Sequence, residues 1–204
     1  MSKLSEAEVQ FYMGEALKEA QFAKMIDEVP IGAVVVHDGK IIGRGHNLRE
    51  HSQDATTHAE VLAITEACAY LRSWRLWDCQ LFVTIEPCLM CSGTIINSQI
   101  PEVYFGARDP KAGAVRSLYM VLEDQRLNHQ VEVREGVAAD QAAGLMKSFF
   151  KAIRERRKKN GKIVEILLKF EYHSYCRKAL RQGWTYELCQ VRKEAALSML
   201  WLVP

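Results

Sequence analysis

Two short motifs constrain this chain most, because together their side chains make up a metal site. His58-Ala-Glu60 supplies an imidazole and a carboxylate, and Pro87-Cys88-Leu-Met-Cys91 supplies two thiols. Zn²⁺ takes four protein ligands in structural sites but three in catalytic sites, where water or substrate fills the fourth position. Since His58, Cys88 and Cys91 are three suitable ligands, we expect them to bind one Zn²⁺ per chain and to leave a position open for chemistry.

The spacing within each motif suits the start of a helix. Cys88 and Cys91 share one helix face, and Pro87 suits the first helical position, where the positive end of the dipole favours thiolates. His58 and Glu60 can both reach a metal that lies off the end of a helix beginning near residue 58. Three polar residues are candidates for the cap of that helix: Asp54, Thr56 and Thr57.

Glu60 is the carboxylate left over once the three ligands are assigned. Bound Zn²⁺ lowers the pKa of water from about 16 toward roughly 7, and we expect Glu60 to take that proton and return it. The alternative is that Cys88 and Cys91 are a redox pair or half of a four-cysteine site, with His58 and Glu60 as ordinary helix residues. The sequence has no second closely spaced cysteine pair, which argues against this alternative.

This combination of motifs resembles the zinc-dependent nucleobase deaminases. Four further segments resemble the bacterial tRNA-specific adenosine deaminases: Val29-Pro-Ile-Gly-Ala-Val, Gly45-His-Asn47, Thr84-Ile-Glu-Pro-Cys88 and Tyr104-Phe-Gly-Ala-Arg-Asp109. The resemblance covers about residues 5 to 159. It implies a three-layer α/β/α fold of the cytidine deaminase type, a homodimer, and hydrolysis of adenosine to inosine at the wobble position of a tRNA anticodon loop, that of an arginine tRNA.

The resemblance also implies how the substrate base is held and protonated. Glu60 would protonate N1 of the adenine and carry a proton to the leaving ammonia, after the base has left its stack. Asn47 would position the base; the alternative is a turn residue that satisfies its own backbone. Pro30, Ile31 and Ala33 would form the pocket wall, a role compatible with a buried strand.

A second group of residues would contact the RNA outside the pocket. Arg108, Asp109 and Lys111 would meet the RNA backbone and flanking nucleotides, the alternative being a salt-bridged surface loop. An aromatic side chain of the last helix would stack on an unpaired base. Of the adjacent Phe149 and Phe150 we expect only one to do so, because one of two neighbouring aromatics usually lies in the core, and we assign the contact to Phe149.

Positive charge is concentrated in one stretch of a chain whose net charge is only +2. Residues 147–159 contain seven Lys or Arg, among them Arg154, against the single acid Glu155, a net charge of +6. Composition alone leaves phosphate binding and a solvated helix surface as open alternatives. The resemblance favours RNA binding, with Arg154 as a contact.

Periodicity and turn signals predict a mixed five-stranded sheet. Apolar residues at three- and four-residue steps predict a helix over 5–27, and Asp38-Gly39 between two β-rich runs, 31–36 and 40–45, predicts a hairpin. The remaining predicted elements are strands at 81–85, 103–107 and 131–133 and helices at 58–71, 114–123 and 140–158. The helix near 114–123 would be the crossover between two parallel strands.

Length and composition allow one full core with an appendage. The 204 residues are 49% hydrophobic, and we divide them into a zinc-dependent deaminase domain, 1–159, and an extension, 160–204, without a recognisable motif, which could form a short helix or two. No apolar run is long enough to cross a bilayer and no signal peptide is recognisable, so we expect a cytoplasmic protein with free cysteines.

Two other functions compete with tRNA deamination. A deaminase of a free base or nucleotide, such as guanine, cytosine or deoxycytidylate, would share the zinc motifs, but the basic stretch argues against it. A zinc-bearing RNA-binding protein without catalysis would leave Glu60 without a purpose.

Overall fold

The computed structural model describes the backbone of residues 4–181 and the side chains of residues 4–160. The chain divides into two compact units, Met1–Phe150 and Lys151–Pro204. The elements are α1 (Glu6–Met25), β1 (Gly32–His37), β2 (Lys40–His46), α2 (Arg49–Ser52), α3 (Ala59–Leu71), β3 (Cys79–Ile85), α4 (Leu89–Ser98), β4 (Glu102–Ala107), the 3₁₀ turn η1 (Val121–Glu123), β5 (Glu132–Arg134) and α5 (Ala139–Arg181).

The five strands form one mixed sheet in the order β2-β1-β3-β4-β5. Strand β1 pairs antiparallel with β2 and β3, while β3–β4 and β4–β5 are parallel. The β1–β2 hairpin turns at Asp38 and Gly39, whose φ angles are 47° and 72°. Two positive φ angles in succession are what a tight hairpin turn requires, so the Asp-Gly signal is confirmed.

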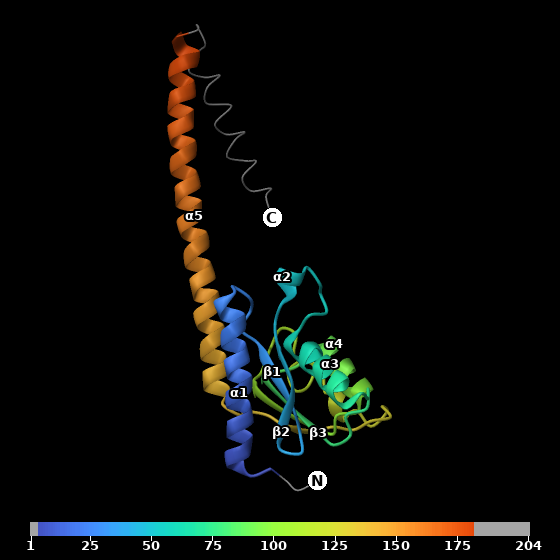
Figure 1. Cartoon of the computed structure of the whole chain (residues 1–204). Coiled ribbons are helices and arrows are strands. Elements are labelled where there is room, and N and C mark those ends of the chain that lie inside the picture. Colours follow the sequence, from blue (N-terminus) through green and yellow to red (C-terminus); the bar gives the residue numbers. More distant parts are fainter. Residues whose placement is uncertain (1–3, 182–204) are drawn as a thin grey trace. The chain divides into compact units, whose positions relative to one another are not determined.

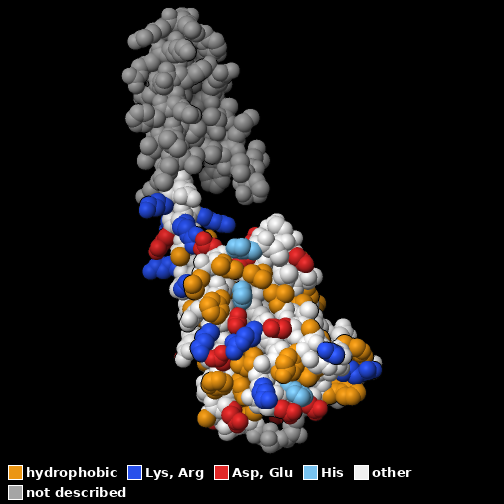
Figure 2. Space-filling model, viewed as in Figure 1, with side chains coloured by type: hydrophobic (Ala, Val, Ile, Leu, Met, Phe, Trp, Pro, Cys, Tyr) orange, Lys and Arg blue, Asp and Glu red, His pale blue; other side chains and the backbone are white. Residues whose placement is uncertain are grey.

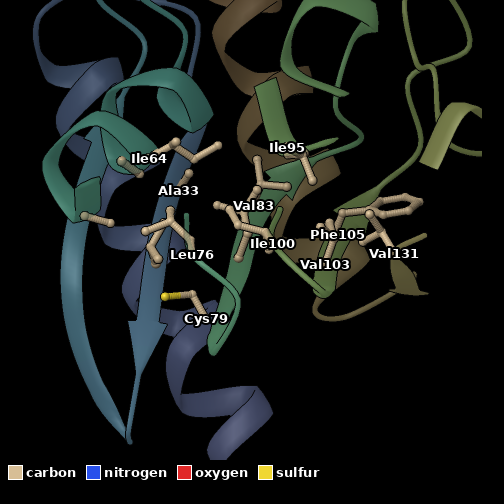
Figure 3. Packing of buried hydrophobic residues seen from close by; sticks show 14 of the residues in the cluster. Ala33, Ile64, Leu76, Cys79, Val83, Ile95, Ile100, Val103, Phe105 and Val131 are labelled. Carbon is tan, nitrogen blue, oxygen red and sulfur yellow. The ribbon is translucent and has the colours of Figure 1, made fainter. Parts of the chain in front are cut away.

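Helices cover both faces of the sheet, as Figure 1 shows. Alternate strand residues point to opposite faces: Val34 and Phe82 pack with α1 and the first turns of α5, whereas Ala33 and Leu81 pack with α3 and α4. Figure 3 shows the buried residues on the α3 and α4 side of the sheet, where Ala33, Val83 and Ile95 lie close together. These layers confirm the three-layer α/β/α fold.

The connection between the parallel strands β4 and β5 differs from the prediction. No helix spans 114–123; the segment consists of turns and the short η1. The main-chain N–H groups of residues 115–117 donate to the carboxylate of Glu86. Because these N–H groups donate to Glu86, they cannot form the main-chain hydrogen bonds of a helix, so the predicted crossover helix is wrong. The cause is Glu86, a residue distant in the sequence.

Helix α5 also differs from the prediction, because it passes the expected end at residue 158 and continues to Arg181. Gly161 lies within it, but one glycine costs a helix only about 1 kcal/mol, and the sequence contains no proline between Pro110 and Pro204. Residues 182–204 of the predicted extension lie outside the described residues, and the boundary at 159/160 stays a prediction. No described helix combines the length and hydropathy of a membrane span.

Candidate active site

The structure brings together the three predicted metal ligands from two helix ends. His58 is the N-cap of α3, Cys88 is the N-cap of α4, and Cys91 lies in the first turn of α4. Nδ1 of His58 lies 3.6 Å from Sγ of Cys88 and 3.5 Å from Sγ of Cys91. Two ligands of a tetrahedral zinc, at Zn–S about 2.3 Å and Zn–N about 2.0 Å, stand about 3.5 Å apart. The donor types and their spacing therefore fit Zn²⁺.

The helix starts differ in detail from the predicted ones. Pro87 precedes the N-cap of α4 and does not occupy the first helical position. None of the three polar candidates caps α3: Asp54 instead accepts hydrogen bonds from the main-chain N–H and the hydroxyl of Thr56, within a local turn. His58 and Cys88 make no side-chain capping bond. Their imidazole and thiol are therefore available to a metal.

The charges of the two thiols are coupled. A hydrogen bond from the Cys91 thiol lowers the pKa of Cys88 to about 4, with help from His58 and against the effect of burial. The same hydrogen bond, together with burial, raises the pKa of Cys91. Since a metal binds thiolates, metal binding at this pair releases thiol protons.

Glu60 lies beside the ligands on the first turn of α3 and is buried. Burial raises its pKa to about 7, and the negative charge of Cys88 adds to the rise, while His58 opposes it. A carboxyl group with a pKa near neutrality can both accept and donate a proton at physiological pH. This is the property that the predicted proton-transfer role requires.

Asn47 follows β2 directly and its side chain is buried. Its Nδ2 donates to Oε2 of Glu28 at 2.9 Å, so the amide links two segments and does not serve its own turn. Its main-chain N–H donates to the carbonyl of Ile31, which joins Asn47 to the predicted pocket wall. Within that wall Pro30 is buried and Ile31 is half-buried, whereas Ala33 lies in the core between the sheet and α3.

Glu86 anchors the loop that follows β4, a role that was not predicted. Its carboxylate accepts four main-chain N–H groups, those of Asp109 and of residues 115–117, at 2.6 to 3.0 Å. Burial alone would raise the pKa of Glu86, but the hydroxyl of Ser117 and the main-chain N–H groups of Arg116, Ser117 and Asp109 hold it below its ordinary value. Gly113 pairs with Cys88, and a Cβ on it would lie 2.3 Å from the Glu86 carboxyl. The loop is thus fixed against the segment that carries a metal ligand.

The residues predicted to contact RNA from this loop have different environments. Arg108 forms two hydrogen bonds with Glu135, at 2.7 and 2.8 Å, as in the salt-bridged alternative. Oδ1 of Asp109 accepts the main-chain N–H of Lys111 at 2.9 Å and thereby tightens the turn. The side chain of Lys111 is exposed.

The two aromatic candidates divide as expected, one buried and one exposed. Phe149 is 4% exposed and packs edge-to-face on Phe150, which is 41% exposed. Exposure therefore favours Phe150 over the predicted Phe149 for stacking on a base. In the second unit, Arg154 is exposed, and Figure 2 shows Lys and Arg side chains gathered on this stretch of α5.

Two functional candidates, Glu28 and Glu86, were missed by the sequence analysis. Both are acidic residues at the end of an apolar or helical segment, and a proline follows each within two residues, Pro30 after Glu28 and Pro87 after Glu86. A charge in such a place is a weak signal of burial, and it does not reveal the partners.

Comparison with known proteins gives concordant matches. The model of a family described as MafB19-like deaminase matches residues 7–154. A tRNA-specific adenosine deaminase of Streptococcus pyogenes serotype M1 is 54% identical over 148 residues, which cover 72% of this chain and 86% of that protein. The protein of the same name from Bacillus subtilis is 48% identical over 149 residues, 73% of this chain and 92% of that protein.

Solved structures match a similar share of the chain. One, from a study of A-to-I editing by tRNA:A34 deaminases at the wobble position of transfer RNA, is 41% identical, with a TM-score of 0.64, and covers 66% of this chain and 98% of that one. A guanine deaminase from Nitrosomonas europaea matches with a TM-score of 0.61 over 69% of this chain and 83% of that one. At 24% identity this second match speaks for the fold alone.

Proposed function

This chain belongs to the MafB19-like deaminase family, among the tRNA-specific adenosine deaminases, and from this premise we propose that it hydrolyses adenosine to inosine at the wobble position of a tRNA anticodon loop. The observation that carries the proposal is the buried Glu60 beside the three candidate metal ligands that the described residues bring together. Three ligands leave a position for water, and the carboxyl group supplies the proton transfer that hydrolysis of an amidine needs.

The chemistry divides between a metal and the side chains around it. His58, Cys88 and Cys91 hold one Zn²⁺, which when bound acts as a Lewis acid that makes water nucleophilic at neutral pH. Glu60 takes a proton from the attacking water and delivers it to N1 of the adenine. The same carboxyl group then carries a proton to the departing amino group, so that adenosine and water become inosine and ammonia.

We assign binding of the base to Asn47 and to the segment that leads into β1. Asn47 orients the base by its amide, and Pro30 and Ile31 provide the apolar wall against which the base packs. A base seated there would displace water from the site, which strengthens the electrostatic interactions within it.

Binding of the RNA falls to exposed basic and aromatic side chains. Arg154 and its basic neighbours on α5 attract phosphates, Arg108 and Lys111 contact the backbone near the flipped nucleotide, and Phe150 stacks on an unpaired base. Asp109 shapes the loop between them. We further propose an arginine tRNA as substrate, a homodimer as the active form and the cytoplasm as the place of action, all three by extension from the family.

The test is inosine formation in an anticodon stem-loop of an arginine tRNA, read by sequencing after incubation with purified protein. Contacts with the RNA away from the reacting base provide the energy that positions it, so we expect activity to exceed that on free adenosine, cytidine or guanine by orders of magnitude. A stem-loop with guanosine at the wobble position is the control. Comparable rates on a free base or nucleoside would instead indicate a small-molecule deaminase.

A further inference from the structure

Glu28 is a charged residue that the mechanism above does not use, although its side chain is completely buried. We propose that Glu28 is a positioning residue that fixes the amide of Asn47 and, through it, the orientation of the target base. This inference rests on the proposed function, because it assumes that Asn47 contacts the base.

The contacts of Glu28 join two segments of the pocket. Oε2 accepts Nδ2 of Asn47 at 2.9 Å. Oε1 accepts the main-chain N–H of His51 at 2.7 Å and lies 3.1 Å from Nδ1 of the same residue. Both carboxylate oxygens thus accept a hydrogen bond, one from the Asn47 side chain just after β2 and the other from the His51 main chain in α2.

A carboxylate gives the amide of Asn47 a defined polarity. The two ends of an asparagine amide have nearly the same shape but opposite hydrogen-bonding character, and each oxygen of Glu28 accepts an N–H group. Nδ2 of Asn47 must therefore face Glu28, which turns Oδ1 away from it. An apolar residue would fill the same volume with less desolvation, but it would leave the amide free to turn over.

The backbone of Glu28 is itself held in place by a hydrogen bond, so its carboxylate can position Asn47. Its N–H donates to the carbonyl of Ala23 at the end of α1, at 2.9 Å, and the preceding Asp27 has a φ of 62°, the left-handed conformation that often ends a helix. Three residues further on, the carbonyl of Ile31 accepts the N–H of Asn47. One main-chain bond and one side-chain bond thus set the position of Asn47 relative to the pocket wall.

Glu28→Gln tests the role of this carboxylate with little change in volume. A glutamine side chain has one acceptor oxygen and one NH₂ donor group. The NH₂ group would have to face either Asn47 or His51, and each of these residues already directs an N–H group at this position. Misplacing a substrate-orienting group typically costs roughly 10- to 100-fold in rate, and we expect a loss of that size in kcat/KM on the stem-loop. Glu28→Asp, which keeps a carboxylate, should recover part of it.

A double-mutant cycle separates positioning from general support of the fold. Asn47→Ala removes the amide that Glu28 is inferred to orient, so Glu28→Gln should lower kcat/KM no further in that background. Glu19→Gln is the matched control, because Glu19 is also buried and accepts from Arg44 and His46 but does not contact Asn47. It should leave kcat/KM unchanged.

A second measurement reports on the amide without any catalysis. Hydrogen exchange of the Asn47 side-chain amide, followed by ¹⁵N NMR, should be slow in the natural protein and in Glu19→Gln. In Glu28→Gln it should be faster, and in Glu28→Asp intermediate between the two. A variant that only weakens the fold would instead speed exchange across the core.

Two results would overturn the inference: an equal loss from Glu28→Gln with and without the Asn47 amide, or unchanged exchange of that amide. Inactivity of the natural protein on the stem-loop would count against the proposed function instead. In that case the exchange measurement would still decide whether Glu28 fixes Asn47.

Discussion

Glu60 lies among the metal ligands, yet its removal should have a different effect from theirs. Glu60→Gln keeps the size of the side chain but removes the group that transfers protons, so we expect deamination to fall by about 10²- to 10⁴-fold. Zinc content should stay near one per chain, because His58, Cys88 and Cys91 provide the ligands. Inosine formation and elemental analysis on the same sample measure both.

Cys91→Ser is the control for this experiment, and it should lower zinc content as well as activity. Loss of zinc together with activity in Glu60→Gln would show that Glu60 supports the site and does not act in proton transfer.

Cys79 offers a check on the core between the sheet and α3. Burial raises the pKa of its thiol to about 12, so at pH 8 almost no thiolate forms, and the thiolate is the form that iodoacetamide attacks. We expect Cys79 to stay unmodified in the folded protein and to react in urea, as mass spectrometry of digested samples would show. Rapid alkylation without denaturant would mean that this core opens readily.

The approach of strand β2 to helix α3 depends on a glycine. A Cβ on Gly45 would lie 2.1 Å from the carbonyl oxygen of Ala59. Ala59 is the first residue of α3, the helix whose N-cap is His58. We expect Gly45→Ala to destabilise the protein by about 1–3 kcal/mol or more and to lower zinc affinity. Urea denaturation and zinc titration would measure these effects.

Gly14→Ala is the matched control, because a Cβ there meets nothing within 4 Å. Gly14 lies within α1, where alanine is favoured by about 0.5–1 kcal/mol, so this variant should be more stable. If Gly45→Ala were as stable as the natural protein, β2 and α3 would be able to separate without cost.

Local sequence predicted the elements that local patterns determine. The hairpin at Asp38-Gly39, the five strands and the helices α1 and α3 follow from periodicity and turn residues, and the start of α4 follows from the spacing of Cys88 and Cys91. The loop before β5 and the cap of α3 did not follow, because their hydrogen-bond partners are set by the folded chain. Glu86 and Glu28 show the same limit: Glu28 reaches Asn47, 19 residues further along the sequence, and no local pattern encodes that distance.

For the molecule as a whole, the family match ends at residue 154, and every ligand precedes that point. We therefore expect a chain that ends at Asn160 to keep its fold, its zinc and its activity. Melting temperature, zinc content and turnover of the truncated and full-length proteins test this. A large drop in any of them would show that the extension covers a surface the enzyme needs.

The basic stretch of α5 should govern how salt affects RNA binding. Each phosphate contact contributes roughly 0.7 to 0.9 to the slope of log K against log salt concentration. Changing four residues to glutamine should therefore flatten the slope: Arg156, Arg157, Lys158 and Lys159. The control neutralises four cations outside the stretch: Lys18, Lys40, Arg72 and Arg126. An unchanged slope in the first variant would identify the stretch as solvated surface.

Glu86 holds the loop after β4 through four main-chain N–H groups and the hydroxyl of Ser117. Every amino acid except proline carries a main-chain N–H group, so these four bonds to Glu86 do not depend on the side chains of the residues that donate them. Natural drift or a laboratory library can therefore change positions 109, 115 and 116 without removing these bonds, provided that the new side chains still fill the core at 115 and hold the turn at 109. In such a library, proline at these three positions is the substitution that selection for activity should remove first.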